Sequence, residues 1–239
     1  MADSPKVSFA RVRPSETSTE EEIRAATVGE PTAVNGPITL VSYDPSWPAF
    51  FAREDARIRS ALAESDVIVE LEHIGSTSVP GLSAKPIIDI QMIVINSSRE
   101  ETYVPQLVAA GYVLRIREPE WEEHRVLKGT DPDVNLHVFS PGSTAARRHL
   151  RFRDHLRTHD ADRDLYERTK RELAVQNWTY VQNYADAKNE VIDEILARAA
   201  RSVTPYFARR TQLNSTSSWV WRTLQDPPAL PSGPSSISY

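Results

Sequence analysis

The sequence predicts an α/β fold of the α+β kind: a mixed, partly antiparallel β-sheet with helices packed on one side, followed by a C-terminal helical segment. Between residues 38 and 142, short apolar and β-branched runs alternate with amphipathic helix patterns. From Ser143 to Thr204 the chain has neither Gly nor Pro, so this stretch has room for two or three long helices. Together the two patterns are typical of a sheet domain that continues into a helical one.

The ends of the chain differ in composition from its middle. Nine of the 17 prolines fall in residues 1–37 and 201–239, among Ser, Thr and Asn. We therefore expect a flexible N-terminal arm over 1–37, an α/β core over 38–142, a helical segment over 143–200 and a tail over 201–239. Trp219 and Trp221 are costly to leave in water, so we expect the tail to dock on the body or on a protein partner.

Composition excludes several functional classes. The 239 residues carry a formal net charge of −5 and include no Cys. Disulfides, thiolate zinc or iron–sulfur sites and a cysteine nucleophile are therefore excluded, and a cytoplasmic location is expected. No apolar run approaches the roughly 18 residues that span a bilayer, so no membrane partner is expected. The mild acidity argues against broad nucleic-acid binding.

The first half of the core shows three strand patterns and one helix pattern. Ile38–Tyr43 predicts a short strand, and Ser46 is placed to cap a helix from Trp47 to about Glu64. Val67–Ile74 is a β-branched strand that ends in a polar loop. Ile87–Ile95 then forms a strand that is nearly all apolar.

The second half of the core begins with a helix. Ser98 and Glu101 have capping-box spacing for a helix that stops at Gly111. Three strands are predicted to follow, over Tyr112–Arg117, His124–Lys128 and Val134–Phe139, and a Thr-Asp-Pro-Asp turn joins the last two.

The polar loop between Gly75 and Gly81 is the most distinctive feature of the chain. A strand that runs into Gly-Ser lets the backbone approach a ligand closely, with free N–H groups and hydroxyls suited to phosphate oxygens. Gly75, Ser76, Thr77 and Ser78 are therefore candidate phosphate ligands. Lys85, further along the same loop, is placed to add a positive charge.

The strand that follows the loop carries a polar stripe. Strand alternation places Asp89, Gln91 and Ile93 on one face and the neighbouring apolar residues on the other. An ionised carboxylate within an apolar strand needs a partner, such as a metal ion or a base. Asp89 is therefore a candidate active-site residue.

A basic segment follows the sheet. Arg147, Arg151 and His155 fall at i, i+4 and i+8, so one helix face can present two guanidiniums and an imidazole to a polyphosphate. A solvated face neutralised by neighbouring acidic residues is the alternative interpretation.

Three other kinds of site fit the sequence less well. A Walker A loop needs four residues between its glycines and then Lys-Ser or Lys-Thr, whereas five residues separate Gly75 from Gly81 and Leu-Ser follows. A Ser/His/Asp hydrolase would draw on Ser76 or Ser78 with His73 and Asp89, but the Gly-x-Ser-x-Gly elbow is absent. Zinc binding by His155 and His159 lacks a third ligand.

The string His-Ile-Gly-Ser-Thr-Ser-Val-Pro-Gly-Leu-Ser-Ala-Lys-Pro-Ile-Ile-Asp-Ile at 73–90 resembles the signature of the GrpB family. This family is a branch of the nucleotidyltransferase superfamily, and members also occur fused to dephospho-CoA kinase. The resemblance extends over residues 38 to 197. It includes Tyr-Asp-Pro-Ser-Trp-Pro at 43–48, Asn-Leu-His-Val-Phe at 135–139, Arg-Phe-Arg-Asp-His-Leu-Arg at 151–157 and Tyr-Ala-Asp-Ala-Lys at 184–188.

The resemblance implies a nucleotidyltransferase-like fold, a nucleoside triphosphate substrate and Mg²⁺ held by several carboxylates. Gly75, Ser76 and Asp89 match the superfamily pattern, but Gln91 takes the place of the second carboxylate, and His137 or Asn135 the place of the third. A single metal bound by Asp89, Gln91 and His137 is one interpretation, and His137 as a general base is another.

The resemblance also implies that Tyr184 and Lys188 face the site from the last long helix, with Lys188 on phosphate. Tyr166 and Lys170 repeat the same spacing and are interpreted as packing and surface residues.

Two functions follow from these residues. The leading hypothesis is an enzyme that binds a nucleoside triphosphate and a divalent metal and transfers, or activates with, a nucleotidyl group on a small-molecule acceptor, with Asp89 and His137 as catalytic residues. The alternative is a nucleotide- or phosphate-binding module, or a partner domain, that has lost metal chemistry. A hydrolase that needs no nucleotide is a third and weaker hypothesis.

Overall fold

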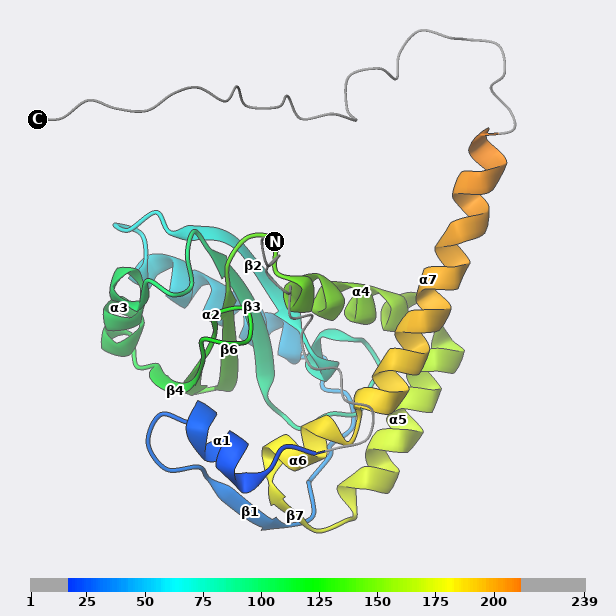
Figure 1. The fold of residues 1–239 in the computed structure, drawn as a ribbon, viewed down its shortest axis with the longest axis horizontal. Helices are drawn as coiled ribbons and strands as arrows, with labels where there is room; N and C mark the ends of the chain where they lie inside the picture. Colours follow the sequence, from blue (N-terminus) through cyan, green and yellow to red (C-terminus); the bar gives the residue numbers. More distant parts are fainter. Residues whose placement is uncertain (1–16, 212–239) are drawn as a thin grey trace, which may run out of the picture. The chain divides into compact units, whose positions relative to one another are not determined.

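The computed structural model describes residues 17–211 (Figure 1). The helices are α1 (Glu20–Ala26), α2 (Trp47–Ala61), α3 (Val104–Ala109), α4 (Thr144–Thr158), α5 (Asp160–Ala174), α6 (Val181–Asp186) and α7 (Asn189–Thr211), with 3-10 turns η1 (Ser76–Ser78) and η2 (Glu100–Thr102). The strands are β1 (Ala33–Gly36), β2 (Ile68–Ile74), β3 (Ile88–Val94), β4 (Val113–Glu118), β5 (His124–Thr130), β6 (Asp133–Phe139) and β7 (Trp178–Tyr180).

Five strands form one mixed sheet in the order β2-β3-β6-β5-β4. The central pair, β3 and β6, is parallel, and every other pair in this sheet is antiparallel. The mixed sheet and the α+β class predicted from the sequence are therefore confirmed. The parallel pairing puts residues of β3 and β6 that share a face directly beside each other.

Helices cover both faces of this sheet in the main body of the chain. Ile88, Ile90 and Met92 of β3 pack with residues of α2 and α3, which form the apolar layer behind the sheet. Ile93 and Phe139 point to the opposite face and contact the first turn of α4. In Figure 1, α2 and α3 lie on one side of the strands and α4 on the other. The predicted alternation along β3 therefore holds, and it sends Asp89 and Gln91 to the α4 side.

Three local predictions were wrong. Residues Ile38–Tyr43 form no strand, because only Val41 pairs there, in an isolated bridge with Ala84. The Ser46 hydroxyl donates to Asp44 instead of capping α2, which has Pro in its first turn. The Ser98 hydroxyl donates to Asn96, and Glu101 lies within η2, so the capping box does not form and α3 starts only at Val104.

The N-terminal arm differs from the expectation of a flexible segment. From residue 17 onward it contains α1 and β1, and β1 pairs with β7 in a second, two-stranded sheet. Thr27 bridges to Ile116 of β4, and the Ser18 amide donates to the Asp186 carboxylate at 2.7 Å. The proline content was misleading because backbone pairing with distant segments, which composition does not encode, orders this part of the chain.

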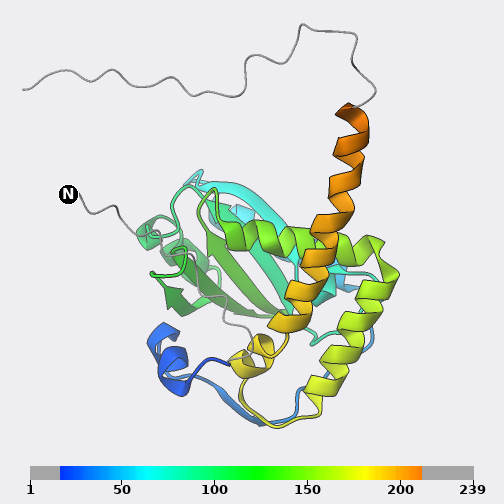
Figure 2. The same cartoon turned by 45° about the vertical axis from the view of Figure 1, so that its right-hand side comes forward.

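The Gly- and Pro-free stretch forms α4, α5 and α7, as predicted, together with the short α6 and β7. Figure 2 shows α4 lying across the sheet and α5 continuing from its end. A second unit begins at Ala200, and the part of it that the structure describes is the remainder of α7. The prediction for Trp219 and Trp221 lies outside the described residues. Between residues 17 and 211, no helix combines the length and hydropathy that crossing a bilayer requires.

Candidate functional site

Gly75 brings the backbone directly against Asp89. Its φ of 69° and ψ of −173° lie in a region that is essentially restricted to glycine. A Cβ placed on Gly75 would overlap the Asp89 carboxylate. β2 and β3 are antiparallel, so the last residue of β2, Ile74, pairs with Asp89 near the start of β3. Gly75, the next residue, therefore lies beside the Asp89 side chain. The close approach fixes the carboxylate at the mouth of the loop.

Asp89 is held from the neighbouring parallel strand. Asp89 pairs in register with Asn135, whose amide nitrogen donates to Asp89 Oδ1 at 2.7 Å, and His137 Nε2 lies 3.9 Å from the same oxygen. Burial alone would raise the pKa of Asp89. Hydrogen bonding with His137 and Asn135 and the charge of Lys85 outweigh burial, so the pKa of Asp89 lies below its ordinary value. Asp89 is therefore an anion at neutral pH.

His137 is the end of a hydrogen-bonded chain that starts at Glu118. Glu118 Oε2 lies 2.7 Å from His124 Nδ1, and His124 Nε2 lies 3.1 Å from His137 Nδ1. A carboxylate accepts a hydrogen bond, so His124 Nδ1 carries the proton. Burial lowers the pKa of His124, which leaves this ring neutral with an accepting Nε2. His137 Nδ1 therefore donates to it, and His137 Nε2 lies on the Asp89 side of the ring.

Lys170 of α5 reaches the loop from the other side. Its ammonium donates to Ser76 Oγ at 3.0 Å and also to the carbonyl of Ser83, and the residue is 2% exposed. Burial is the main reason why the pKa of Lys170 falls to about 7. The charge of Lys188 lowers this pKa further, and Glu167 and Asp89 only partly oppose the decrease.

Two more lysines lie against the ring of Tyr184. Lys188 Nζ is 4.5 Å from the ring centroid and Lys85 Nζ is 5.9 Å from it. Burial and the charge of Lys85 lower the pKa of Lys188 to about 8, and burial lowers the pKa of Lys85 as well. Within residues 17–211, neither side chain forms an ion pair with a carboxylate at bonding distance. The phosphate cluster, defined here as Ser76, Lys85, Lys170 and Lys188, thus has three lysines close enough to Asp89 for its charge to raise the pKa of each.

Comparison with known proteins gives the family. The GrpB protein family model matches residues 37–198, which is most of the chain. The chain belongs to the GrpB family. A UPF0157 protein of Halalkalibacterium halodurans is 56% identical over 181 residues, 76% of this chain and 92% of that protein. A UPF0157 protein of Streptomyces coelicolor is 44% identical over 192 residues, 80% of this chain and 96% of that one.

A solved GrpB structure supports the assignment. The crystal structure of the conserved protein GrpB from Enterococcus faecalis superposes with a TM-score of 0.60 at 30% identity, over 69% of this chain and 99% of that one. A shorter segment is 38% identical over 79 residues to a dephospho-CoA kinase of Mycolicibacterium paratuberculosis, 32% of this chain and 19% of the kinase. The GrpB resemblance seen in the sequence is therefore confirmed, and so is the segment shared with dephospho-CoA kinases.

The structure separates Arg147 and Arg151 from the phosphate cluster. Each lies two residues from His149, which is about 200° around a helix. His149 is the residue that faces the sheet, with Nδ1 3.1 Å from Gln91 Oε1, so both arginines point into solvent. Arg147 donates instead to the Gly142 carbonyl at 2.7 Å. The prediction that one face carries Arg147, Arg151 and His155 toward a polyphosphate is not supported, because His155 is buried against Asp162.

The loop hydroxyls are divided between two roles. Thr77 donates to the Ile87 carbonyl and lies 3.0 Å from His73 Nε2, while Ser78 donates to the Gly75 carbonyl at 2.6 Å. These two hydroxyls hold the loop together. Ser76, which is only partly buried and accepts from Lys170, remains the loop hydroxyl that lies in the phosphate cluster.

The hydrogen bonds of the loop and of α4 also exclude the Ser/His/Asp hydrolase site and the zinc site considered from the sequence. His73 is bonded to Thr77 and Ser78 to a carbonyl, so no Ser/His/Asp triad forms. His155 and His159 stack on each other at 3.8 Å, and His155 Nε2 binds Asp162 at 2.6 Å, which leaves no open zinc site there.

Sequence reasoning missed Lys170, His124 and Glu118. Lys170 was interpreted as a packing and surface residue, yet its spacing from Tyr166 matches that of Lys188 from Tyr184, and each ammonium lies over its own tyrosine ring. The repeated i, i+4 spacing of Tyr and Lys was the sequence feature from which Lys170 could have been predicted as a site residue. Lys188 itself follows the short α6 and precedes α7, so it does not lie on the last long helix as expected.

The donors around Asp89 do not suit a resident Mg²⁺. Across residues 17–211, no group of three or more His, Asp or Glu side chains is arranged to hold a metal ion. Asp89 already accepts from Asn135, His137 offers a nitrogen, and the Gln91 oxygen is directed to His149. Mg²⁺ prefers several oxygen ligands, and the nearby lysines would repel it.

Proposed function

We propose that this protein binds the polyphosphate of a nucleoside triphosphate in the phosphate cluster, as part of a nucleotidyltransferase-like site. The observation that carries the proposal is the group of three partly or fully buried lysines, of which Lys170 donates to Ser76 while Lys85 and Lys188 lie against the Tyr184 ring. Burial of three ammonium groups is unfavourable on its own, and a bound anion of charge −3 to −4 would offset it. Burial is the main reason why the pKa values of all three fall, and the positive charge of neighbouring lysines lowers them further.

In this arrangement phosphate oxygens take the positions between the lysines. Ser76 Oγ and the N–H groups of the Gly75 turn are the neutral donors. The lysines supply charge as point donors, without the fixed fork of an arginine. The divalent cation, in this proposal, arrives as the counter-ion of the nucleotide and not as a resident ion.

A calorimetric titration with ATP tests binding. We expect a 1:1 complex in EDTA, because the protein itself supplies the positive charge. Lys170→Met and Lys188→Met should each weaken binding at least tenfold, whereas Arg151→Met, the matched control on a solvent-exposed helix face, should not change it. The absence of binding to ATP, to other nucleoside triphosphates and to inorganic triphosphate would contradict the proposal.

Transfer of the nucleotidyl group to a small-molecule acceptor is the second candidate. The transfer step uses His137 with Nε2 unprotonated, and this atom lies 3.9 Å from Asp89 Oδ1. An O–H group placed there donates its one hydrogen to His137 Nε2. In the transfer step the acceptor oxygen forms a bond to the α-phosphorus, its proton moves to His137 Nε2, and the bond to the β-phosphate oxygen breaks to release pyrophosphate.

The transfer hypothesis has its own assay. Pyrophosphate release with ATP and pooled hydroxyl-bearing acceptors should appear with the native protein and fall at least a hundredfold in His137→Gln. ATP affinity should change less than threefold in the same variant. If ATP binds but no acceptor pool gives pyrophosphate, the binding function stands and the transfer hypothesis is wrong.

A further inference from the structure

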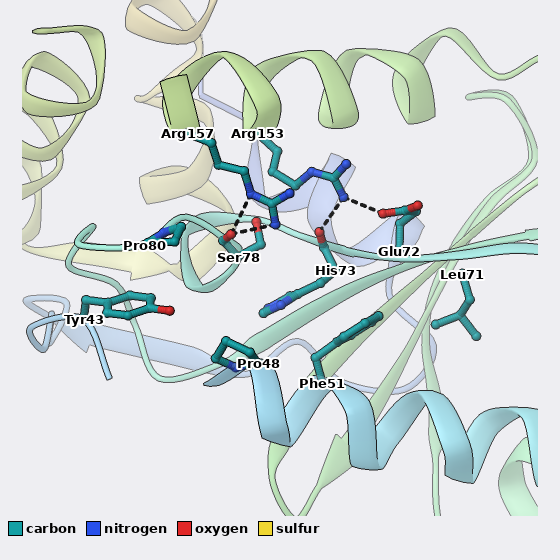
Figure 3. A pocket seen from close by; sticks show the side chains of 10 residues that line it. All are labelled: Tyr43, Pro48, Phe51, Leu71, Glu72, His73, Ser78, Pro80, Arg153 and Arg157. Carbon is teal, nitrogen blue, oxygen red and sulfur yellow. Dashed lines mark hydrogen bonds and ion pairs between the residues drawn. The ribbon is translucent and has the colours of Figure 1, made fainter. Parts of the chain in front are cut away.

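A pocket of about 540 Å³ lies behind the Gly75–Gly81 loop, away from Asp89 (Figure 3). Four elements line it: α2 with the segment before it, β2, the loop itself and α4. The lining residues are Tyr43, Pro48, Phe51, Leu71, Glu72, His73, Ser78, Pro80, Arg153 and Arg157. The volume falls within the range of roughly 300–1,000 Å³ that small-molecule sites occupy. Neither the phosphate cluster nor Asp89 contributes a side chain to it.

One wall of this pocket is cationic. Figure 3 shows Arg153 and Arg157 descending side by side from α4. Arg153 is paired with Glu72 at 2.6 Å and with Asp154 at 2.8 Å, so its charge is matched. Arg157 gives Nε and Nη2 to the Ser78 carbonyl, at 3.0 and 2.8 Å, and its Nη1 is 3.6 Å from Asp154. Nη1 thus has N–H donors with no acceptor at hydrogen-bond distance among the residues described.

The opposite wall is flat and aromatic. The His73 ring stacks on Phe51 with centroids 4.9 Å apart and planes 8° apart. Burial lowers the pKa of His73 to about 4, so this stack is uncharged at neutral pH. Tyr43 and Pro48 extend the surface toward solvent. A planar ring fits such a wall because one whole face of the ring can lie against it.

The geometry points to a second ligand site here, for a small aromatic carboxylate whose ring lies between Tyr43 and Phe51 and whose carboxylate accepts from Arg157. The site is coupled to the phosphate cluster through the loop. Arg157 holds the Ser78 carbonyl, and Ser78 holds the Gly75 carbonyl, so a ligand that engages Arg157 acts on the backbone that positions Ser76. The coupling rests on the proposed function, whereas the pocket itself does not.

The first test uses a matched pair of probes. Naphthalene-2-carboxylate should bind and shift the amide NMR signals of Ser78 and Gly81, while naphthalene-2-carboxamide should bind at least tenfold more weakly. Arg157→Met and Tyr43→Ala should each reduce carboxylate binding at least tenfold, and Arg151→Met should leave it unchanged. Equal binding of the two probes, or no binding at 5 mM, overturns the site.

Arg157→Met removes two hydrogen bonds to the Ser78 carbonyl, so the folding of this variant is checked by thermal unfolding. Tyr43→Ala affects neither hydrogen bond and serves as the independent variant. Coupling is then measured as the change in ATP affinity at saturating naphthalene-2-carboxylate, with a reciprocal change in probe affinity expected. An unchanged ATP affinity would refute the coupling. If ATP does not bind at all, the proposed function fails, while the probe titration alone still decides the pocket.

Discussion

Lys170 shows how one residue can link ligand binding to pH. Its pKa falls from 10.5 to about 7 on folding, and that of Lys188 falls to about 8, so near neutral pH both ammonium groups are close to losing their protons. A bound polyphosphate favours the charged forms and raises both pKa values. Binding should therefore take up protons from the buffer.

The first prediction concerns this proton uptake. ATP affinity should fall as the pH is raised from 6 to 9, because Lys170 and Lys188 become neutral before the ligand binds. Calorimetry in buffers with different ionisation enthalpies should report net proton uptake at pH 8. A pH-independent affinity, or proton release, would show that neither lysine touches the anion.

The same pKa shift also affects stability. Between pH 7 and 10.5 the unfolded chain carries a proton on Lys170 that the folded chain lacks, so this residue makes the free energy of unfolding rise with pH across that window. Lys170→Met should flatten this rise. Urea unfolding at pH 6.5 and 9.5 measures it, and Arg151→Met, in which the rise should persist, is the control.

A further prediction at the residue scale concerns Gly75. Gly75→Ala places a side chain against Asp89 in a backbone region restricted to glycine, which should cost about 2 kcal/mol or more. Gly81→Ala also has a positive φ but has open space around it, so its cost should be smaller, about 1 kcal/mol. Chemical denaturation compares the two. Equal losses would mean that the contact with Asp89 is not what requires glycine.

At the scale of elements, a buried polar contact joins α2 to the start of β4. Tyr112 donates to Glu54, a carboxylate only 1% exposed, and Arg57 lies 3.4 Å from the same group while donating to the Ala110 carbonyl. Burial is the main reason why the pKa of Tyr112 rises to a value at which it stays protonated. The contact fixes α2 against the back of the sheet, and Phe51 of this helix lines the pocket behind the Gly75–Gly81 loop.

Removing that contact should be costly. Tyr112→Phe leaves Glu54 with an unmet acceptor in the core and should lower the free energy of unfolding by about 1–3 kcal/mol. Arg59→Ala, which breaks an exposed pair with Asp55 on the same helix, should change it by less than about 1 kcal/mol. Denaturant midpoints distinguish the two, and a loss in Tyr112→Phe no larger than in Arg59→Ala would contradict the role given to this contact.

The elements differ in how well the sequence predicted them. β3 was predicted almost to the residue because its run of Ile and Met is buried on one face, and the period of two is set by the strand itself. Ile38–Tyr43 has a similar composition but no continuous partner, so it pairs only through Val41. The side chains of Ser98 and Glu101 found nearer partners than the helix end.

In the candidate site, too, residues close together in sequence were predicted, and residues brought in from distant segments were not. Gly75, Ser76 and Asp89 were identified because the loop and its strand adjoin in sequence. Lys170 and the chain from Glu118 through His124 were missed because β5 and α5 bring them in from distant parts of the chain. Arg147 and Arg151 were favoured by spacing alone, and spacing does not show which face of a helix is buried.

At the scale of the molecule, residues 17–36, which precede the region matched by the GrpB family model, pack against the rest of the domain. β1 adds a strand to β7, and Asn183 Nδ2 donates to the Ser18 carbonyl at 2.8 Å. α1 buries Ile23 and its end is bonded to β4 through the Val28 amide. This segment therefore supports α6, the helix that carries Tyr184 and leads into Lys188.

Deleting residues 1–36 should lower the free energy of unfolding by about 2 kcal/mol, the value of one buried Ile together with its strand pairing. It should also weaken ATP binding, because α6 would lose its contacts with Ser18. Hydrogen exchange should show faster exchange in β7 and α6 and unchanged protection in β3. Uniform protection in the deleted form would show that the segment is dispensable.

The parallel pairing of β3 with β6 has a consequence for the order of events during synthesis. β2 and β3 can pair across the loop between them, but that pair supplies Asp89 without Asn135, the residue that holds its carboxylate. Asn135 lies 46 positions further along the chain, and closing so long a segment is entropically slow. The proposed phosphate cluster also needs Lys170 and Lys188, so a nascent chain on the ribosome would complete the proposed site only after residue 188 has emerged, and a ligand added during refolding would stabilise only species in which β6 and α5 have already docked.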